Sequence, residues 1–262
     1  MADTVTRARV IAMANQKGGV GKTTATVNIG AALAELGHRV LIIDLDPQGN
    51  ASSSLGLVPA SLQVSVYDVL LQDLPLENCV EATAVRGLFI APSNLNLAGA
   101  EIELVPMMGR ETRLRRAIDG VADHYTFVLI DCPPSLGLLT INALTAADEV
   151  LVPMQCEYIA VEGMVQLDQN VDLVRANLNP RLHISMVLLQ MYDARTKLSQ
   201  DVVEEVRKHP TWGPKTLKTV IPRTVRIAEA PSYGKPVITF DPASVGAKAY
   251  REAAKEIAAW QE

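Results

Sequence analysis

The chain has 262 residues, of which 48% are hydrophobic and 20% are charged. This length and hydrophobic content are sufficient for a large buried core, and they exclude a disordered chain and a small disulfide-stabilised scaffold. The formal net charge is -5, with 24 Lys and Arg against 29 Asp and Glu, so the overall charge indicates neither a nucleic-acid nor a membrane partner.

Short hydrophobic runs rich in β-branched residues alternate with helical stretches along the chain, which is typical of βα units and a buried parallel sheet. Strands are predicted over residues 10–14, 40–44, 88–91, 127–131, 149–153, 184–191 and 217–221 and, from a less regular run, over 237–240. Helices are predicted over residues 22–36, 111–122, 161–176, 199–209 and 245–260.

Turn-forming residues make the stretch 51–106 the least regular part of the chain, and we expect short helices there over one edge of the sheet. We see no repeat, low-complexity tract or long linker. These patterns predict one α/β domain over residues 1–262, with residues 1–8 as a flexible extension. The expected fold is a doubly wound, mostly parallel sheet with helices on both faces, whose ligands bind at the carboxyl ends of the strands.

The cysteines and the hydrophobic runs bear on the cell compartment. Cys79, Cys132 and Cys156 form no C-x-x-C pair, which favours a reducing environment. The longest hydrophobic runs have the length of strands, and residues 1–9 contain no hydrophobic segment typical of a signal peptide. We therefore expect a cytoplasmic protein.

The strongest local motif lies between the first predicted strand and the first predicted helix, where residues 15–24 read NQKGGVGKTT. Its three glycines allow the backbone to curl so that successive N–H groups point at a phosphate, and the following helix adds its positive amino end. Lys22 is predicted to contact the β- and γ-phosphates and the Thr23 hydroxyl to bind magnesium. The predicted phosphate-binding residues are Lys17, Gly18, Gly19, Val20, Gly21, Lys22, Thr23 and Thr24.

This motif departs from the standard P-loop pattern G-x-x-x-x-G-K-[ST] at its first position. Gln16 stands where that pattern has glycine, and a second lysine, Lys17, follows it. An isolated Gly-Lys-Thr is more often an ordinary surface loop. Here the glycines, the preceding strand and the following helix agree, so we predict a nucleotide phosphate site.

The sequence KGGVGKTT resembles the deviant Walker A motif of the ParA and MinD group of ATPases, and DLDPQGN at residues 44–50 resembles the ParA (Soj) form of the switch segment. The similarity continues through DCPPS at 131–135, MYDART at 191–196 and IPRTVRIAEAPS at 221–232, and it covers roughly residues 9–256. The resemblance implies a P-loop NTPase of the deviant Walker A type that hydrolyses ATP with Mg²⁺.

The resemblance also implies roles for charged residues near the phosphates. In this family the lysine at the position of Lys17 crosses a dimer interface to the partner's nucleotide, so that two chains enclose two ATP molecules. The predicted catalytic residues are then Lys17, Lys22 and Asp46. Of these, Asp46 would orient the attacking water. Asp44 and Asp131 end hydrophobic strands and are expected to hold magnesium with Thr23. An Asp at a strand end also serves as a turn or helix cap, and the assignment of roles among the three aspartates stays open.

The expected base is adenine, because we find no Asn-Lys-x-Asp or Thr-Lys-x-Asp element that would read guanine. By resemblance, Pro222 and Arg223 pack beside the adenine and Met191 borders it. Without the resemblance, these residues would indicate only a turn at the end of a strand.

The charge is distributed unevenly along the chain. Residues 1–174 contain 10 Lys and Arg against 20 Asp and Glu, whereas residues 175–262 contain 14 against 9. A basic strip could bind DNA phosphates without reading sequence, although basic side chains on helices can equally serve only to solvate the surface. Our candidates are Arg195, Lys197, Lys218 and Arg226, of which Arg195 and Arg226 are the strongest.

By resemblance, ATP-driven dimerisation would double this strip, and hydrolysis stimulated by a ParB-type partner would release the DNA. The implied function is segregation of a chromosome or plasmid by a cytoplasmic, nucleoid-associated ATPase. Two alternatives remain open: a MinD-like membrane-associated positioning ATPase, and a nucleotide-gated scaffold with incidental turnover. Residues 250–262 are rich in Ala with mixed charge, so no membrane partner is expected.

Overall fold

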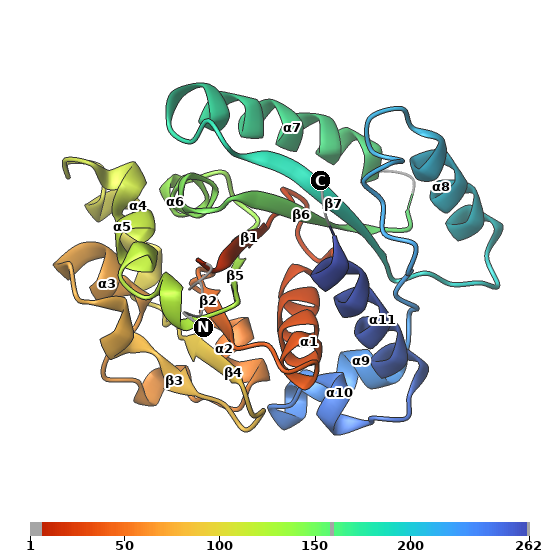
Figure 1. Ribbon diagram of the computed structural model, residues 1–262, viewed down its shortest axis with the longest axis horizontal. Coiled ribbons are helices and arrows are strands. Elements are labelled where there is room, and N and C mark those ends of the chain that lie inside the picture. Colours follow the sequence, from red (N-terminus) through yellow and green to blue (C-terminus); the bar gives the residue numbers. More distant parts are fainter. Residues whose placement is uncertain (1–6, 158–159, 261–262) are drawn as a thin grey trace, which may run out of the picture.

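The computed structural model describes residues 7–157 and 160–260. At its centre is a seven-stranded sheet with the strand order β3-β4-β2-β5-β1-β6-β7 (Figure 1). All neighbouring strands run parallel except β3 and β4, which are antiparallel. In chain order the strands are β1 (Arg9–Met13), β2 (Val40–Asp44), β3 (Glu81–Ala82), β4 (Leu88–Ala91), β5 (Phe127–Asp131), β6 (Glu149–Gln155) and β7 (His183–Gln190).

Helices cover both faces of this sheet, and each face has its own hydrophobic core. Because side chains alternate along a strand, Val10 and Ala12 of β1 lie in one core while Ile11 and Met13 lie in the other. The first core packs under α3 (Val66–Gln72), α4 (Leu97–Glu103), α5 (Arg113–Asp119), α6 (Leu138–Ala146), α7 (Ala160–Asn177) and α8 (Lys197–Lys208). The second packs under α1 (Lys22–Glu35), α2 (Asn50–Ser54), α9 (Val225–Glu229), α10 (Val237–Phe240) and α11 (Val245–Ala259).

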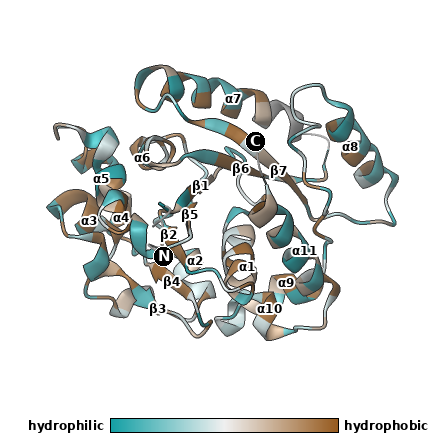
Figure 2. Ribbon diagram, viewed as in Figure 1, coloured by the Kyte–Doolittle hydropathy of each residue, from teal (hydrophilic) through white to brown (hydrophobic). Residues whose placement is uncertain are grey.

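The doubly wound, mostly parallel α/β fold expected from the sequence is confirmed. Hydrophobic residues follow the strands and the sides of the helices that face them (Figure 2). The predicted strands over 10–14, 40–44, 88–91 and 127–131 match β1, β2, β4 and β5 to within one residue, and residues 51–106 contain α2, α3 and α4 as expected. The predicted helix over 111–122 is shorter, because α5 is flanked by 3₁₀ turns at Arg110–Thr112 and Ala122–His124.

The prediction of a strand over 217–221 is wrong. This segment runs beside β7, and the N–H groups of Leu217 and Ile221 donate to the carbonyls of Val187 and Leu189, each at 2.9 Å, but no continuous ladder forms between them. The reason lies in α11, where the Glu256 carboxylate accepts the backbone N–H groups of Lys218 and Thr219 at 2.7 and 2.8 Å. These two amides therefore cannot join a continuous ladder with a neighbouring strand.

The prediction of a strand over 237–240 is also wrong, because these residues form the single turn α10. Pro236 precedes that turn, and the N–H of Val237 donates to the side-chain oxygen of Asn28 on α1 at 2.7 Å. A four-residue hydrophobic run is too short for its periodicity to separate a strand from a buried helical turn.

The predicted N-terminal extension falls largely outside the described residues, since residues 1–6 are not among them. Ala8 is buried, and its N–H donates to the carbonyl of Ala122 at 3.3 Å. Among the described residues, no helix is both long enough and apolar enough to cross a membrane.

Candidate nucleotide site

The glycine-rich motif forms the loop that joins β1 to α1, at the carboxyl edge of the sheet. Gly19 and Gly21 have φ angles of 75° and 86°, a left-handed conformation in which a side chain would be strained, and Gly21 is the N-cap of α1. A Cβ on Gly18 or Gly19 would meet nothing within 4 Å, so this part of the loop borders open space. The loop is therefore shaped to receive a ligand against the amino end of α1.

Lys22 lies inside this loop. Its side chain folds back along the loop, and Nζ donates to the carbonyl of Lys17 at 3.3 Å. Only 7% of the residue is exposed. Burial lowers the pKa of Lys22, and the nearby Asp131 carboxylate opposes that shift. A buried ammonium group inside a glycine loop is suited to phosphate oxygens.

Two side chains that the sequence analysis did not select hold the end of the loop. Gln190, the last residue of β7, donates from Nε2 to the carbonyls of Val20 and Gly21 at 3.0 and 3.2 Å. The hydroxyl of Tyr250 on α11 donates to Gln190 Oε1 at 2.9 Å. Both side chains are buried, and a Cβ on Gly21 would lie 3.0 Å from Gln190 Nε2. No local pattern signals this contact, because the partners are far apart in sequence.

The start of the loop is held separately. Asn15 is buried, and its Nδ2 donates to the carbonyl of Pro153 on β6 at 2.8 Å. Its Oδ1 accepts the N–H of Lys17 at 3.0 Å. Fixing both ends leaves the glycines between them free to set the shape of the hollow.

Asp44 and Asp131 end the adjacent strands β2 and β5, where they are register partners, and both are fully buried. Ser52 donates to Asp44 Oδ2 from its N–H at 2.8 Å and from its hydroxyl at 2.7 Å. The Thr26 hydroxyl donates to Asp131 Oδ1 at 3.0 Å, and the nearby Thr23 side chain also lowers the pKa of this carboxyl. Burial, with the neighbouring aspartate, raises the pKa of Asp131 to about 8, and burial raises that of Asp44 to about 6.

These residues fit a magnesium ion that is bound together with phosphates. The described residues contain no group of three or more His, Cys, Asp or Glu that could hold a metal ion alone. Mg²⁺ usually keeps several waters and uses only one or two protein oxygens plus phosphate oxygens. Asp131 Oδ2 is buried without a hydrogen-bond partner among the described residues, beside Thr23, and offers such an oxygen.

Asp46 and Lys17 lie at the rim of the site. Asp46 is half-buried; its N–H donates to Asp44 Oδ1 at 3.3 Å, and its Oδ1 accepts the N–H of Gln48 at 2.9 Å. The Lys17 side chain leaves the loop, and its Nζ lies 3.5 Å from the Glu157 carboxylate in the segment that follows β6. The two lysines of the motif thus occupy different places, Lys22 within the loop and Lys17 outside it.

A cavity of about 530 Å³ adjoins the loop. Its lining includes Gly21 and Thr24 together with Met191, Pro222 and Arg223. The structure thus brings the three residues predicted to surround the base beside the phosphate loop. Met191 has a left-handed φ of 55°, which is unusual for a residue with a side chain.

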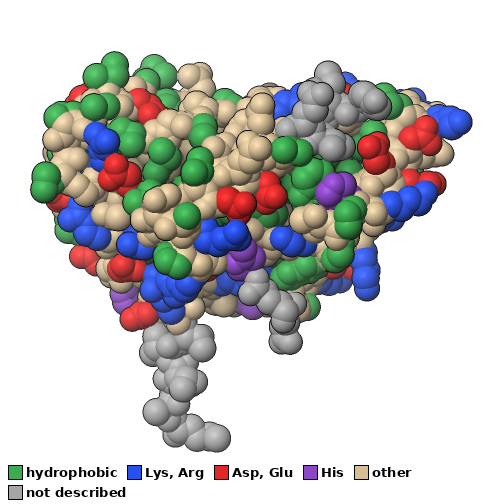
Figure 3. Space-filling model, turned by 90° about the horizontal axis from the view of Figure 1, so that it is seen from above, with side chains coloured by type: hydrophobic (Ala, Val, Ile, Leu, Met, Phe, Trp, Pro, Cys, Tyr) green, Lys and Arg blue, Asp and Glu red, His purple; other side chains and the backbone are tan. Residues whose placement is uncertain are grey.

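The basic residues chosen from the charge distribution are in different surroundings. Arg195 lines the same cavity and forms two hydrogen bonds with Asp193, at 2.9 and 2.7 Å, which hold the pKa of Asp193 at about 2. Arg226 pairs with Glu229 and Asp241, each at 3.2 Å. The remaining two, Lys197 and Lys218, are exposed and form no ion pair with any described residue. On the face seen in Figure 3, Lys and Arg are interspersed with Asp and Glu.

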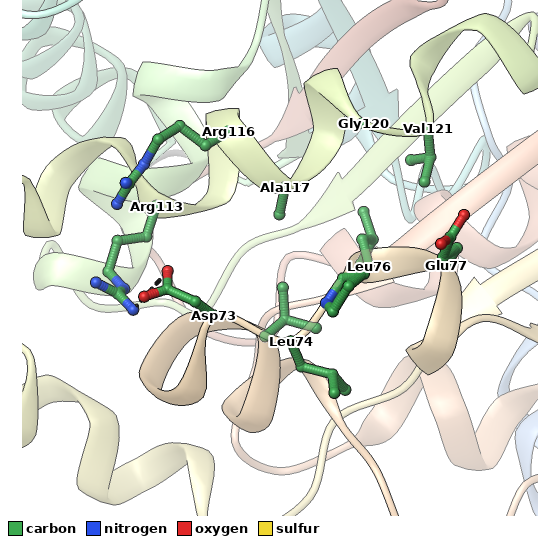
Figure 4. Close-up of a pocket in the computed structure, with 11 residues that line it drawn as sticks. Asp73, Leu74, Leu76, Glu77, Arg113, Arg116, Ala117, Gly120 and Val121 are labelled. Atoms are coloured by element: carbon green, nitrogen blue, oxygen red, sulfur yellow. Dashed lines mark ion pairs between the residues drawn. The ribbon is translucent and has the colours of Figure 1, made fainter.

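A second cavity, of about 320 Å³, lies between α3 and α5 (Figure 4). Arg113 lines it, and this nearly buried guanidinium pairs with Asp73 at 2.8 Å and bonds the carbonyl of Leu70 at the end of α3. None of the residues predicted to bind nucleotide lines this cavity. Its arginine ties two helices together, so we assign it a structural role.

Comparisons with known proteins agree on one family. A family model described as an AAA domain matches residues 8–184. The chain is 55% identical over 251 residues to the sporulation initiation inhibitor protein Soj of Bacillus subtilis, covering 96% of this chain and 98% of the relative. It is 50% identical to the chromosome partitioning protein ParA of Caulobacter vibrioides, covering 95% and 93%.

Solved structures give the same fold. A crystal structure described as cobyrinic acid a,c-diamide synthase from Mycobacterium smegmatis with bound ADP and magnesium has a TM-score of 0.84 and 43% identity, covering 96% of this chain and 94% of that one. The cell division ATPase MinD of Pyrococcus furiosus has a TM-score of 0.77 and 27% identity, covering 96% and 98%.

The raised pKa of Asp131 predicts that the metal-free protein loses stability as the pH rises. Burial raises the pKa of both Asp131 and Asp44, so above the ordinary aspartate pKa of about 4 the folded chain holds protons that the unfolded chain has released, and the free energy of unfolding falls as the pH rises toward the folded-state pKa values. Urea denaturation in EDTA at pH 5, 6.5 and 8 measures this slope. Asp131→Asn should make the slope shallower, with Asp44 responsible for the part that remains; an equal slope in both proteins would contradict the assignment.

Tyr250→Phe should weaken both the fold and the phosphate loop. Removing the hydroxyl leaves the buried Gln190 Oε1 without its donor, which costs about 1–3 kcal/mol. Urea denaturation and calorimetric titration with ADP measure the two effects. Tyr233→Phe is the matched control, because Tyr233 is 66% exposed. If the two variants were equally stable, the loop would not depend on this hydrogen bond.

Proposed function

The chain belongs to the ParA/Soj family of chromosome-partitioning ATPases, and we propose that it acts as a single ATPase domain that binds ATP with Mg²⁺ at the loop between β1 and α1 and dimerises around the bound nucleotide. The main support is the separation of the two lysines. Lys22 is buried within the loop, whereas Lys17 extends from its rim to Glu157. One lysine can thus serve the chain's own phosphates while the other is available to a partner's nucleotide.

Within one chain, Lys22 and the backbone amides of the loop hold the β- and γ-phosphates against the amino end of α1. Mg²⁺, bound by Thr23 and with Asp44 and Asp131 holding its hydration shell, would neutralise the negative charge of the phosphates. Asp46 accepts a hydrogen bond from the attacking water and orients it toward the γ-phosphate. The chain's residues thus act by position and charge and form no bond to the substrate.

The adenine occupies the cavity beside the loop. Met191, Pro222 and Arg223 line it together with Gly21 and Thr24, so a nucleotide whose phosphates lie in the loop reaches this cavity with its base. The size of the cavity, about 530 Å³, suits a nucleoside.

Dimerisation couples the nucleotide to DNA. Lys17 of each chain contributes positive charge to the partner's γ-phosphate, so the triphosphate stabilises the dimer and its cleavage weakens it. In the dimer, the basic residues Arg195, Lys197, Lys218 and Arg226 of both chains contact DNA phosphates without reading sequence. A ParB-type partner then stimulates hydrolysis and releases the DNA, so that the protein serves chromosome or plasmid segregation on the nucleoid.

Three substitutions separate the proposed roles. Lys22→Ala should lower ATP affinity at least about tenfold, because the buried ammonium contacts the phosphates directly. Lys17→Ala and Asp46→Ala should both bind ATP normally and lose hydrolysis. The first variant cannot dimerise, and the second cannot orient the attacking water. Calorimetry measures ATP affinity and phosphate release measures hydrolysis, with Lys208→Ala, a change at an exposed lysine, as the control. Normal turnover by Asp46→Ala would refute its catalytic role.

The DNA contacts are tested with Lys197→Ala and Lys218→Ala. Because these lysines have no described ion-pair partner, their removal should weaken ATP-dependent DNA binding more than removal of Arg195, which Asp193 already neutralises. Because the dimer carries each lysine twice, one substitution removes two phosphate contacts and should reduce the magnitude of the slope of log affinity against log salt by about 1.8. Anisotropy with random duplex DNA, in ATP and in ADP, measures both. Lys255→Ala, which is paired with Glu252, is the control.

Unchanged affinity and slope in both lysine variants would contradict the DNA assignment. Sedimentation with anionic lipid vesicles, with and without ATP, tests the membrane alternative, which ATP-dependent pelleting would favour.

A further inference from the structure

The first turn of α6 is capped by a residue from another helix. The N-cap position is Gly137, which has no side chain to accept the free N–H groups of the turn. The carboxylate of Glu101 on α4 accepts them instead, Oε2 from the N–H of Leu138 at 2.7 Å and Oε1 from that of Leu139 at 3.3 Å. A carboxylate at the positive end of a helix is also favoured electrostatically.

Gly137 leaves the space that this contact needs. A Cβ on Gly137 would overlap both carboxylate oxygens of Glu101 and would lie 2.5 Å from its Cδ. The φ of Gly137 is -85°, so its backbone does not require glycine. The structure therefore explains glycine at this position by the approach of Glu101.

The segment fixed by Glu101 is the loop of residues 132–137, which joins Asp131 to α6. At its start, the N–H of Cys132 donates to the carbonyl of Met13 on β1 at 3.4 Å. Within it, the carbonyl of Ser135 accepts the Thr140 hydroxyl at 2.6 Å. Figure 1 shows α4 and α6 as neighbours on the same side of the sheet.

This loop lies against the residues that lead into the phosphate loop. Pro133, Ser135 and Leu136 line a narrow crevice together with Asn15 and Gln16. Gln16 precedes Lys17 directly, and Asp131 precedes the loop directly. A shift of the loop would therefore move both the backbone of Lys17 and the carboxylate of Asp131.

We infer that Glu101 is a positioning residue for ATP hydrolysis, which acts by holding the loop 132–137 against residues 15–16. The inference rests on the proposed function. It assigns Glu101 to the hydrolytic step and not to nucleotide binding. The residues that shape the phosphate loop, Lys22, Gln190 and Tyr250, are held by hydrogen bonds that do not involve Glu101.

A second carboxylate on α4 provides a matched control. Glu103 lies two residues after Glu101, but it accepts a hydrogen bond from the Tyr67 hydroxyl at 2.8 Å and does not contact α6 in any described bond. Its replacement changes the charge of the same helix without releasing the loop.

The test compares Glu101→Ala, Glu101→Gln, Gly137→Ala and the double variant Glu101→Ala/Gly137→Ala with wild type and Glu103→Ala. Steady-state hydrolysis gives kcat, and calorimetry with ATP in EDTA gives nucleotide affinity. Glu101→Ala should lower kcat about tenfold, with affinity changed less than about twofold, because only the position of the loop is disturbed. Glu101→Gln keeps one accepting oxygen and should restore part of kcat.

Gly137→Ala should reproduce the decrease in kcat with Glu101 present, and the double variant should be no slower than either single variant, because both changes break one contact. Additive decreases, or equal decreases of kcat and affinity, would overturn the inference. So would normal kcat in Glu101→Ala while wild type is active. Absence of hydrolysis in wild type would instead overturn the proposed function, and the inference with it.

Discussion

The site depends on one constraint: the loop between β1 and α1 must keep a hollow shape, and contacts from outside the loop hold both of its ends. Gly19 and Gly21 adopt left-handed conformations, and a Cβ on Gly18 or Gly19 would meet nothing within 4 Å, so the loop borders open space where a ligand would lie. Bonds from two other strands supply the rigidity. Asn15 ties the start of the loop to β6, and Gln190 at the end of β7 ties its end, with Tyr250 orienting the amide. The sheet therefore holds the phosphate site as much as the motif does.

The same edge of the sheet brings together buried ionisable side chains whose hydrogen bonds within the protein are incomplete. Asp44 is satisfied by Ser52, whereas one oxygen of the equally buried Asp131 has no described partner, and Lys22 is buried beside it. Leaving buried polar groups without partners destabilises a fold, so such an arrangement is expected where a ligand completes the set. A magnesium-bound polyphosphate supplies both missing charges, a cation for the aspartates and anions for the lysine.

The sequence predicted those features that depend on neighbours along the chain. Strand runs, the glycine motif and the aspartates that end β2 and β5 follow from local pattern, and the structure places them together. The prediction of a strand over 217–221 was wrong because the Glu256 carboxylate, on the last helix, accepts two of the backbone N–H groups of this segment. Gln190, Tyr250 and Glu101 were missed because each acts across a long stretch of sequence. The charge distribution along the chain did not show that Asp193 pairs with Arg195, two residues away, and the DNA contacts stay a prediction.

The central claim is that a triphosphate joins two copies of this chain. Sedimentation equilibrium of the wild-type protein tests it most directly, in the presence of Mg²⁺ with a non-hydrolysable ATP analogue, with ADP and without nucleotide. The account predicts twice the chain mass of 28.3 kDa with the triphosphate and the single chain mass in the other two samples. The same mass in all three would contradict it, even if the loop bound both nucleotides tightly.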